Sequence, residues 1–367
     1  MRFLERERAA VAKLLPGLDE ALRAVPLMEL EGTGSPGIRF FRESGGAALL
    51  APASQQGRGA TTLDALRVQR ALGARTPSVA SATAAHHFSL AVLLALASVG
   101  DSMLPQLVEG VVTSDRLMAF AFSEEHYGAG ILSPAVTAVA ESDLVRVSGA
   151  ARPGGLASSM DLLMAAVTVP RSDGKGEETA VALLPAESDG LNVDRADNER
   201  VTLDGVAVPP DLLVRSSALD GHLEAALTTG LAQYQLLTTA GCLGAASALV
   251  EQVLLDTRVP ESERVRLLVE TEAAMAAAEG VARRIDDGAA DTSILADALY
   301  TRYSVQDTLY RVIPRATELL ADLGSVGADE VAHLAGRAND LALRPPARLR
   351  ASGPLAAYLA GGPLTVV

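Results

Sequence analysis

The stretch Leu162-Leu-Met-Ala-Ala-Val-Thr-Val169 is a short apolar run that ends at Pro170. A second run, Thr179-Ala-Val-Ala-Leu-Leu184, follows after the polar stretch Arg171-Ser-Asp-Gly-Lys-Gly176. Apolar runs of this length, rich in Val and bounded by Gly, Pro and Asp, are typical of β-strands. The pattern therefore predicts two strands joined by an exposed hairpin loop over residues 171–176.

Two more runs of the same kind flank this pair. Leu144-Val-Arg-Val147 precedes it, and Val201-Thr-Leu-Asp-Gly-Val-Ala-Val208 follows it. Together the four runs predict a β domain over residues 117–217, built as a small sheet or barrel.

The sequence on both sides of this region has a helical pattern. In residues 1–116, leucines recur at helical spacing, and residues 78–99 predict a buried Ala/Leu helix. Residues 218–367 contain four long apolar-rich stretches, which predict a helical bundle: 223–257, 263–287, 293–323 and 330–343. The predicted fold class is α+β, mainly α, with an N-terminal helical domain, a middle β-barrel-like domain and a C-terminal four-helix bundle.

The composition limits the possible partners. A net charge of −14 argues against nucleic acid, whose phosphates need a basic surface. The single cysteine, Cys242, cannot form an internal disulfide, so we expect a buried, inert thiol and a reducing compartment. No signal peptide is visible, and the longest apolar run, near residues 88–99, is too short to cross a bilayer. A cytoplasmic protein without membrane association is therefore expected.

Few motifs in the chain indicate chemistry. Gly32-Thr-Gly-Ser-Pro-Gly37 matches the three-glycine dinucleotide pattern. That motif needs a strand before it and a helix after it, and Pro36 with Ile38-Arg-Phe-Phe41 does not predict the start of a helix. The five histidines are scattered, so no metal site is expected. His86 and His87 fall within an apolar helix, where packing is the expected role.

The segment Met118-Ala-Phe-Ala-Phe-Ser-Glu-Glu-His-Tyr-Gly-Ala-Gly130 passes from an apolar strand into a turn of small residues. Its backbone amides and the Ser123 hydroxyl could meet a polar ligand, although alone it is an ordinary strand-to-loop junction. Together with four other segments in the same order, it resembles the acyl-CoA dehydrogenase family. Those segments are Gly45-Gly-Ala-Ala-Leu-Leu-Ala-Pro52 with Gly57-Arg-Gly59, Ser78 to His87, Gly100 to Gly110, and Val201 to Pro209.

The resemblance covers nearly the whole chain and implies the three-part fold described above. It also implies FAD bound between the β domain and the bundle, in a site completed by a neighbouring subunit. The family removes a proton and a hydride from adjacent carbons of an acyl thioester, using a carboxylate base and flavin N5. Five positions match FAD-binding residues of the family: Phe122 and Ser123 at the flavin ring, Arg258 at the partner's pyrophosphate, and Gly324 and Gly327 near the adenosine.

The departures from the family concern the catalytic groups. Glu124 keeps the family's Glu in its motif, but the position of the usual carboxylate base falls on Pro346. The alternative base position, on the first bundle helix, holds Tyr234. Three further family residues are also replaced: the aromatic residue beside the flavin by Pro153-Gly-Gly155, a Gln by Ala321, and the Pro of the T-E-P motif by Glu125.

These losses leave three interpretations open. The base has moved, with Glu124, Glu125 or Tyr234 as candidates, although a Tyr of pKa about 10 is a poor base unless the site lowers that pKa. Alternatively, the chain is the non-catalytic subunit of a hetero-oligomer, or a repurposed scaffold that binds an acyl thioester without redox chemistry.

The expected function is FAD-dependent dehydrogenation of an acyl-CoA or acyl-carrier-protein thioester, with an electron acceptor, in specialised metabolism. The resemblance implies a homodimer, homotetramer or heterotetramer. An acidic carrier protein would need a basic patch on this acidic chain, and Arg344, Arg348 and Arg350 could form one.

Overall fold

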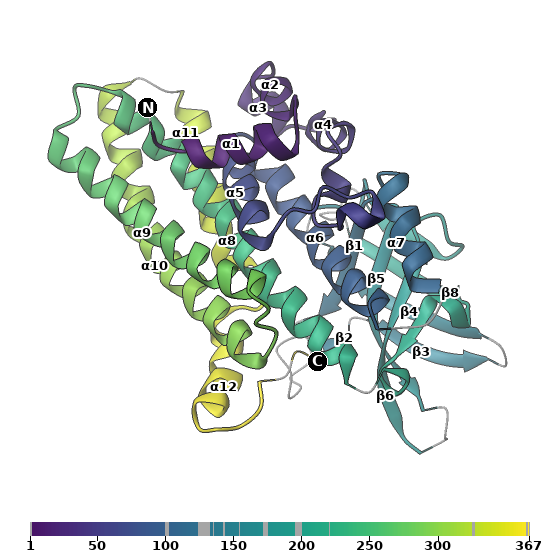
Figure 1. Cartoon of the computed structure of the whole chain (residues 1–367). Coiled ribbons are helices and arrows are strands. Elements are labelled where there is room, and N and C mark those ends of the chain that lie inside the picture. The colour runs from purple at the N-terminus through teal and green to yellow at the C-terminus, as the bar shows by residue number, and fades with distance from the viewer. Residues whose placement is uncertain are drawn as a thin grey trace.

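The computed structural model describes residues 2–99, 103–123, 133–134, 136–141, 144–153, 155–171, 175–194, 200–219, 221–324, 327–364 and 366. Figure 1 shows the sheet at one end of the molecule and the long helices of the bundle running away from it. The first part holds seven helices within the described residues: α1 (Glu5–Leu14), α2 (Leu18–Arg23), α3 (Leu27–Leu30), α4 (Gly37–Glu43), α5 (Thr62–Gly73), α6 (Pro77–Ala97) and α7 (Met103–Thr113).

The middle of the chain forms one sheet with the strand order β2-β1-β5-β3-β4-β8-β7, and β6 joins β5 to β9. The strands are β1 (Met118–Ser123), β2 (Ser133–Pro134), β3 (Val136–Glu141), β4 (Leu144–Ala151), β5 (Leu162–Pro170), β6 (Glu177–Pro185), β7 (Leu191–Asp194), β8 (Arg200–Val208) and β9 (Leu213–Arg215). The predicted hairpin is confirmed, because β5 pairs with β6 antiparallel from Leu162↔Pro185 to Pro170↔Glu177. β1 runs parallel to β5, which places the end of β1 at the edge of the sheet nearest to β2.

The bundle consists of α8 (His222–Leu255), α9 (Glu261–Asp286), α10 (Thr292–Leu323) and α11 (Ala328–Asn339). The 3-10 helix η5 (Asp340–Leu343) and the helix α12 (Arg348–Leu359) follow. All four predicted bundle helices are present, and α10 begins where the Asp291 side chain accepts a hydrogen bond from the backbone N–H of Ser293. The fold class is therefore confirmed.

Two interpretations of the sequence need correction: the absence of a helix after Pro36, and the apolar run near residues 88–99 as too short to cross a bilayer. A helix, α4, does begin at Gly37 directly after Pro36, because proline is well tolerated at the start of a helix. The segment before it is the short helix α3 and not a strand, so the dinucleotide motif still lacks its context.

The apolar run near residues 88–99 is the second half of α6, which is long enough to cross a bilayer, as is α8. In their most apolar stretches, α6 is 78% buried and α8 is 89% buried inside the protein, which is typical of core helices.

The boundary predicted after residue 116 lies between α7 and β1, and the one after residue 217 lies in the 3-10 helix Ser216–Ala218. Whether the three parts are separate domains stays a prediction.

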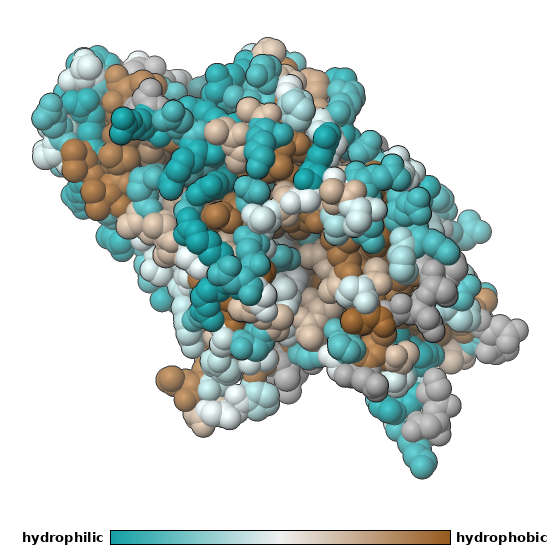
Figure 2. All heavy atoms as spheres, viewed as in Figure 1, coloured by the Kyte–Doolittle hydropathy of each residue, from teal (hydrophilic) through white to brown (hydrophobic). Residues whose placement is uncertain are grey.

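The surface of the bundle carries exposed apolar side chains. Figure 2 shows a mainly polar face with apolar spheres at the outer end of α9 and over α12. Val265 and Val269 of α9 are 55% and 59% exposed, and Leu349 and Leu359 of α12 are 87% and 84% exposed. Exposed apolar groups of this kind suit burial against another surface.

Candidate functional site

Three aromatic rings meet where the sheet, the first part and the bundle come together. They are Phe88 on α6, Phe120 on β1 and Tyr234 on α8, and their ring centroids lie 4.8 to 5.9 Å apart in tilted or edge-to-face pairs. Tyr234 is only 4% exposed, and no described residue forms a hydrogen bond with its hydroxyl. The Tyr234 ring therefore packs where the three parts meet, while its role as a base stays a prediction.

The segment on which the resemblance places the family's base position, residues 341–346, is held by side chains from two bundle helices. Arg302 of α10 is 1% exposed and donates hydrogen bonds to the Leu341 carbonyl oxygen at 3.0 Å and to the Arg344 carbonyl oxygen. It also donates to Oε1 of Gln235 on α8, and Nε2 of Gln235 donates to the Pro345 carbonyl oxygen at 3.2 Å. A buried guanidinium and a buried amide therefore fix the backbone of this segment.

Pro346 itself carries no acid–base group, and cations lie close to it. Its carbonyl oxygen accepts a hydrogen bond of 3.3 Å from the Tyr303 hydroxyl. The Arg348 guanidinium lies over the Tyr303 ring, 5.6 Å from its centroid, and pairs with Asp307 at 2.7 Å. The one carboxylate among these named neighbours, Asp307, is thus already paired with Arg348.

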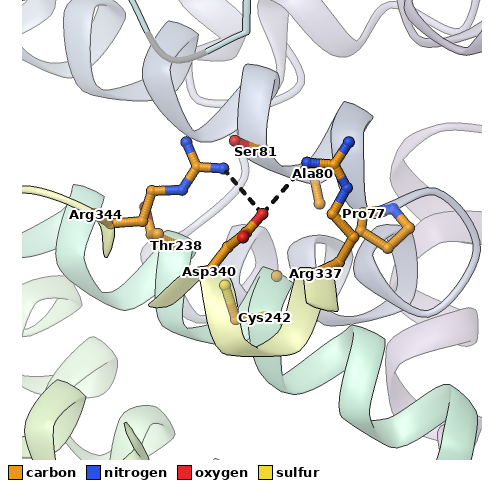
Figure 3. Close-up of a pocket in the computed structure, with 9 residues that line it drawn as sticks. Pro77, Ala80, Ser81, Thr238, Cys242, Arg337, Asp340 and Arg344 are labelled. Atoms are coloured by element: carbon orange, nitrogen blue, oxygen red, sulfur yellow. Dashed lines mark hydrogen bonds and ion pairs between the residues drawn. The ribbon is translucent and has the colours of Figure 1, made fainter. Parts of the chain in front are cut away.

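On its other face, the same segment borders a small pocket between α6 and α8. Figure 3 shows Asp340 between the guanidinium groups of Arg337 and Arg344, at 3.3 Å and 4.0 Å, above Cys242 and Thr238 of α8. The free space is about 10 Å³, which is room for about one water molecule. It is too small for a flavin ring. Burial raises the pKa of the Cys242 thiol to about 11, in agreement with the inert thiol expected from the sequence.

A larger open cleft of about 340 Å³ lies between the N-terminus of α5 and helices α6, α8 and α9. Its one carboxylate, Asp286, accepts hydrogen bonds from the backbone N–H groups of Thr62 at 2.7 Å and Leu63 at 3.0 Å. Gln233 donates to the Thr62 hydroxyl at 2.9 Å. These polar groups cap α5, which is a structural role.

The predicted ring-binding residues lie at the end of β1. Phe122 and Ser123 are its last two residues, and their backbones pair with Pro134 and Ser133 of β2. Glu124, with Glu125, lies outside the described residues. The end of β1 lies next to the aromatic cluster, since Phe120 belongs to both. The binding of a flavin ring by Phe122 and Ser123 stays a prediction.

The other predicted flavin residues lie at the far end of the bundle. Arg258 follows the C-terminus of α8, its side chain is 59% exposed, and Asp256 accepts two side-chain hydrogen bonds from it. Gly324 ends α10 with φ +60°, and a Cβ added at Gly324 or Gly327 would meet nothing within 4 Å. Tyr234 contacts Phe120 near the end of β1, and about 30 Å of α8 separates Tyr234 from the last helical residue, Leu255. The two groups of predicted residues therefore lie far apart within one chain.

The two neighbouring histidines have the packing role that was expected. The His86 Nε2–H donates to the Ala47 carbonyl oxygen at 2.8 Å, while Nδ1 accepts from the Met118 backbone N–H at 3.0 Å. Burial lowers the pKa of His86 to about 4. His87 is also fully buried, against the rings of Phe41 and His86. Within the described ranges, no group of three or more His, Cys, Asp or Glu could hold a metal ion.

No family model matches the chain. Isobutylamine N-hydroxylase of Streptomyces viridifaciens is 37% identical to it over 382 residues, and the match covers 100% of both proteins. The chain belongs to the acyl-CoA dehydrogenase family. Solved structures with the same fold include nitrososynthase of Micromonospora carbonacea var. africana, with a TM-score of 0.79, 16% identity and coverage of 97% of this chain and 96% of that one.

Two other members of this fold show its chemical range. The dibenzothiophene monooxygenase TdsC of Paenibacillus sp. A11-2, solved with FMN and indole, has a TM-score of 0.77 at 16% identity and covers 97% of each chain. The glutaryl-CoA dehydrogenase complex with glutaryl-CoA has a TM-score of 0.74 at 17% identity, over 98% of this chain and 94% of that one. The coarse prediction of a flavin-dependent oxidoreductase agrees with these relatives, whereas dehydrogenation of an acyl thioester and FAD in particular do not follow from them.

Arg302 and Gln235 were not among the residues predicted from the sequence. Arg302 follows Leu295 and Leu299 at helical spacing on an apolar face of α10, and all three are buried. A charged residue at such a position needs buried partners, and this is the signal that could have identified it.

Proposed function

We propose that this chain is a flavin-dependent monooxygenase that hydroxylates the nitrogen of an amine. The observation that carries the proposal is the full-length 37% identity to isobutylamine N-hydroxylase. It is supported by Pro346, which stands where a dehydrogenase of this fold has its carboxylate base.

The chemistry explains why a base is dispensable. A bound reduced flavin supplies two electrons to O₂, so that one oxygen atom enters the product hydroxylamine and the other leaves as water. A dehydrogenase must take a proton from carbon, and this requires a carboxylate close to the substrate. In N-hydroxylation the lone pair of the amine attacks oxygen and no C–H bond breaks. The replacement of the base by Pro346 is therefore compatible with this reaction.

The surroundings of Pro346 also suit an amine that must be neutral to react. An alkylammonium ion has a pKa of about 10, near that of lysine. Burial away from water and a nearby cation both favour the neutral amine over the ammonium ion. Near Pro346 the buried cation is Arg302, which donates to the Arg344 carbonyl oxygen.

A flavin would be shared between two copies of the chain. Phe122 and Ser123 of one copy would bind the ring, while Arg258, Gly324 and Gly327 of another would bind the phosphates and any adenosine. Within one chain, about 30 Å of α8 separates Tyr234, near the ring site, from Leu255, which precedes Arg258. The exposed leucines of α12 offer apolar surface to a second copy. Release of Arg258 from Asp256 would accompany binding.

The experiment supplies the purified protein with a reduced flavin, O₂ and a small primary amine. We expect a product that carries one atom from isotopically labelled O₂, detected by mass spectrometry, together with amine-dependent O₂ uptake. FMN and FAD are compared in parallel. The amines tested form a panel of linear and branched alkylamines. The proposal is contradicted when none of them gives labelled product.

Dehydrogenation of an acyl thioester is the second candidate, because the fold is shared with glutaryl-CoA dehydrogenase. It would require Glu124, Glu125 or Tyr234 as the base. The proposed carrier-binding patch is partly neutralised, since Arg344 lies near Asp340 and Arg348 pairs with Asp307. Anaerobic bleaching of the oxidised flavin by acyl thioesters would favour this candidate, because only a dehydrogenase takes its electrons from the acyl group.

A further inference from the structure

The 341–346 segment has few means of fixing its own backbone. Pro345 and Pro346 have no N–H group to donate. The hydrogen bond of Arg344 N–H to the Leu341 carbonyl oxygen is long, at 3.5 Å. Order in this segment must therefore come from donors outside it.

Arg302 and Gln235 supply those donors. Arg302 donates to the Leu341 and Arg344 carbonyl oxygens, and Gln235 donates to the Pro345 carbonyl oxygen. The two side chains are also bonded to each other, through Arg302 Nη1 and Gln235 Oε1. Gln235 is 0% exposed and Arg302 is 1% exposed, so water does not compete for these bonds.

The position of this pair links it to the proposed reaction. Gln235 follows Tyr234, which packs into the aromatic cluster at the end of the sheet. On the opposite face of the segment, the Arg344 side chain lines the small pocket in Figure 3. Thr238 of α8, one helical turn after Tyr234, lines the same pocket. The segment, called the wall below, is therefore held against α8 within one helical turn of Tyr234 and is anchored to α10 by Arg302.

We propose that Arg302 and Gln235 are positioning residues that keep this wall closed, so that oxygen reaches the amine instead of being lost to water. This inference rests on the proposed N-hydroxylase function. When water enters or the amine shifts, O₂ and the reduced flavin give hydrogen peroxide and oxidised flavin, and no hydroxylamine forms. Closure therefore sets the coupling, which is the hydroxylamine formed per O₂ consumed.

The first test needs no flavin. Hydrogen–deuterium exchange is followed by mass spectrometry on peptides that cover residues 341–344 and 347–350. Replacing the buried arginine (Arg302→Met) should speed exchange at Leu341 to Arg344 at least tenfold. Gln235→Leu removes the donor to Pro345 and one acceptor of Arg302, but it keeps the two Arg302 donors to the segment, so exchange in the same place should speed up less. This second variant keeps the test possible if Arg302→Met does not fold.

The second test measures coupling in the flavin-loaded enzyme with an amine substrate. Both variants should release more peroxide and less hydroxylamine, with the rate of O₂ consumption within about threefold of the unaltered protein. Arg302→Lys, which keeps the charge but not the fork of donors, should recover part of the coupling.

The matched control is Arg70→Met. Arg70 is equally buried, but it pairs with Glu7 and Glu272 at the other side of α5 and α8. This variant should lower the melting temperature while the exchange of residues 341–344 and the coupling stay unchanged.

Two results would overturn the proposal. One is that the Arg302 and Gln235 variants show the same exchange and coupling as the unaltered protein, and the other is that Arg70→Met changes both quantities in the same way. If the unaltered protein makes no hydroxylamine, the proposed function fails, while the exchange data still decide whether the pair orders the wall.

Discussion

The edge of the Tyr234 ring on α8 faces the ring of Phe120 on β1, with 5.3 Å between the centroids and 81° between the planes. Edge-to-face pairs of this kind add about 0.5–1.5 kcal/mol beyond the area that they bury. The contact joins the sheet to the bundle directly. The Tyr234 hydroxyl, in contrast, forms no hydrogen bond with any of the described residues, so the fold uses the ring.

Removal of only the hydroxyl should therefore have little effect. We expect Tyr234→Phe to keep kcat/KM for the amine within about threefold, because N-hydroxylation needs no base at this position. Tyr234→Ala should lower the free energy of unfolding by about 3–5 kcal/mol, as other buried aromatic truncations do. Denaturation by urea and steady-state kinetics check the two outcomes. A hundredfold loss in Tyr234→Phe would instead identify the hydroxyl as a catalytic group.

Arg258 tests whether the flavin is shared between copies. Charged hydrogen bonds contribute about 1.5–3 kcal/mol, so Arg258→Ala should weaken flavin binding by about ten- to a hundredfold. Its unfolding should change little, because its side chain is 59% exposed. Arg266→Ala is the control, since Arg266 is a similarly exposed cation, at 55%, on the adjoining helix α9. Titration of the quenched flavin fluorescence measures both affinities, and equal values for the two variants would remove Arg258 from the site.

The sequence predicted the elements better than the site. The hairpin of β5 and β6 and the four bundle helices follow from local patterns, because apolar spacing and turn residues act within one element. Tyr234 was found through its position in a family motif. Arg302 and Gln235 were missed since their partners are backbone carbonyl oxygens of residues 341–345, far along the chain. Hydrogen bonds to a distant backbone leave no pattern in residue spacing.

His86 and His87 should make the protein sensitive to acid. In the unfolded chain an imidazole binds its proton near pH 6.5, whereas burial lowers the pKa of His86 to about 4 and that of His87 well below its usual value. The unfolded state therefore binds more protons than the folded state in this range, and stability falls as the pH drops from 6.5 to 4. For His86 alone the loss is about 3 kcal/mol.

His87→Leu isolates one part of this effect. Neither ring nitrogen of His87 has a hydrogen-bond partner among the described residues, and a buried polar group without one costs about 1–3 kcal/mol. We expect the variant to be at least as stable as the unaltered protein at pH 7.5 and to lose less stability between pH 6.5 and 4. His222→Gln, at an exposed position on α8, is the control and should leave the pH profile unchanged. Urea midpoints measured across this pH range provide the comparison, and parallel profiles for His87→Leu and the unaltered protein would contradict it.

Replacement of glycine by alanine should have opposite effects on the free energy of unfolding at Gly73 and at Gly280. A Cβ on Gly73 of α5 would lie 2.0 Å from the carbonyl oxygen of Gly241 on α8, so the backbones of the two helices would have to move apart. Since rigid backbone cannot yield as a side chain can, we expect Gly73→Ala to lower the free energy of unfolding by about 3 kcal/mol or more. A Cβ on Gly280 of α9 would meet nothing within 4 Å, and alanine favours a helix over glycine by about 1 kcal/mol. Gly280→Ala should therefore raise the urea midpoint while Gly73→Ala lowers it, and a shift in the same direction for both would show that α5 and α8 do not pack as closely as the fold requires.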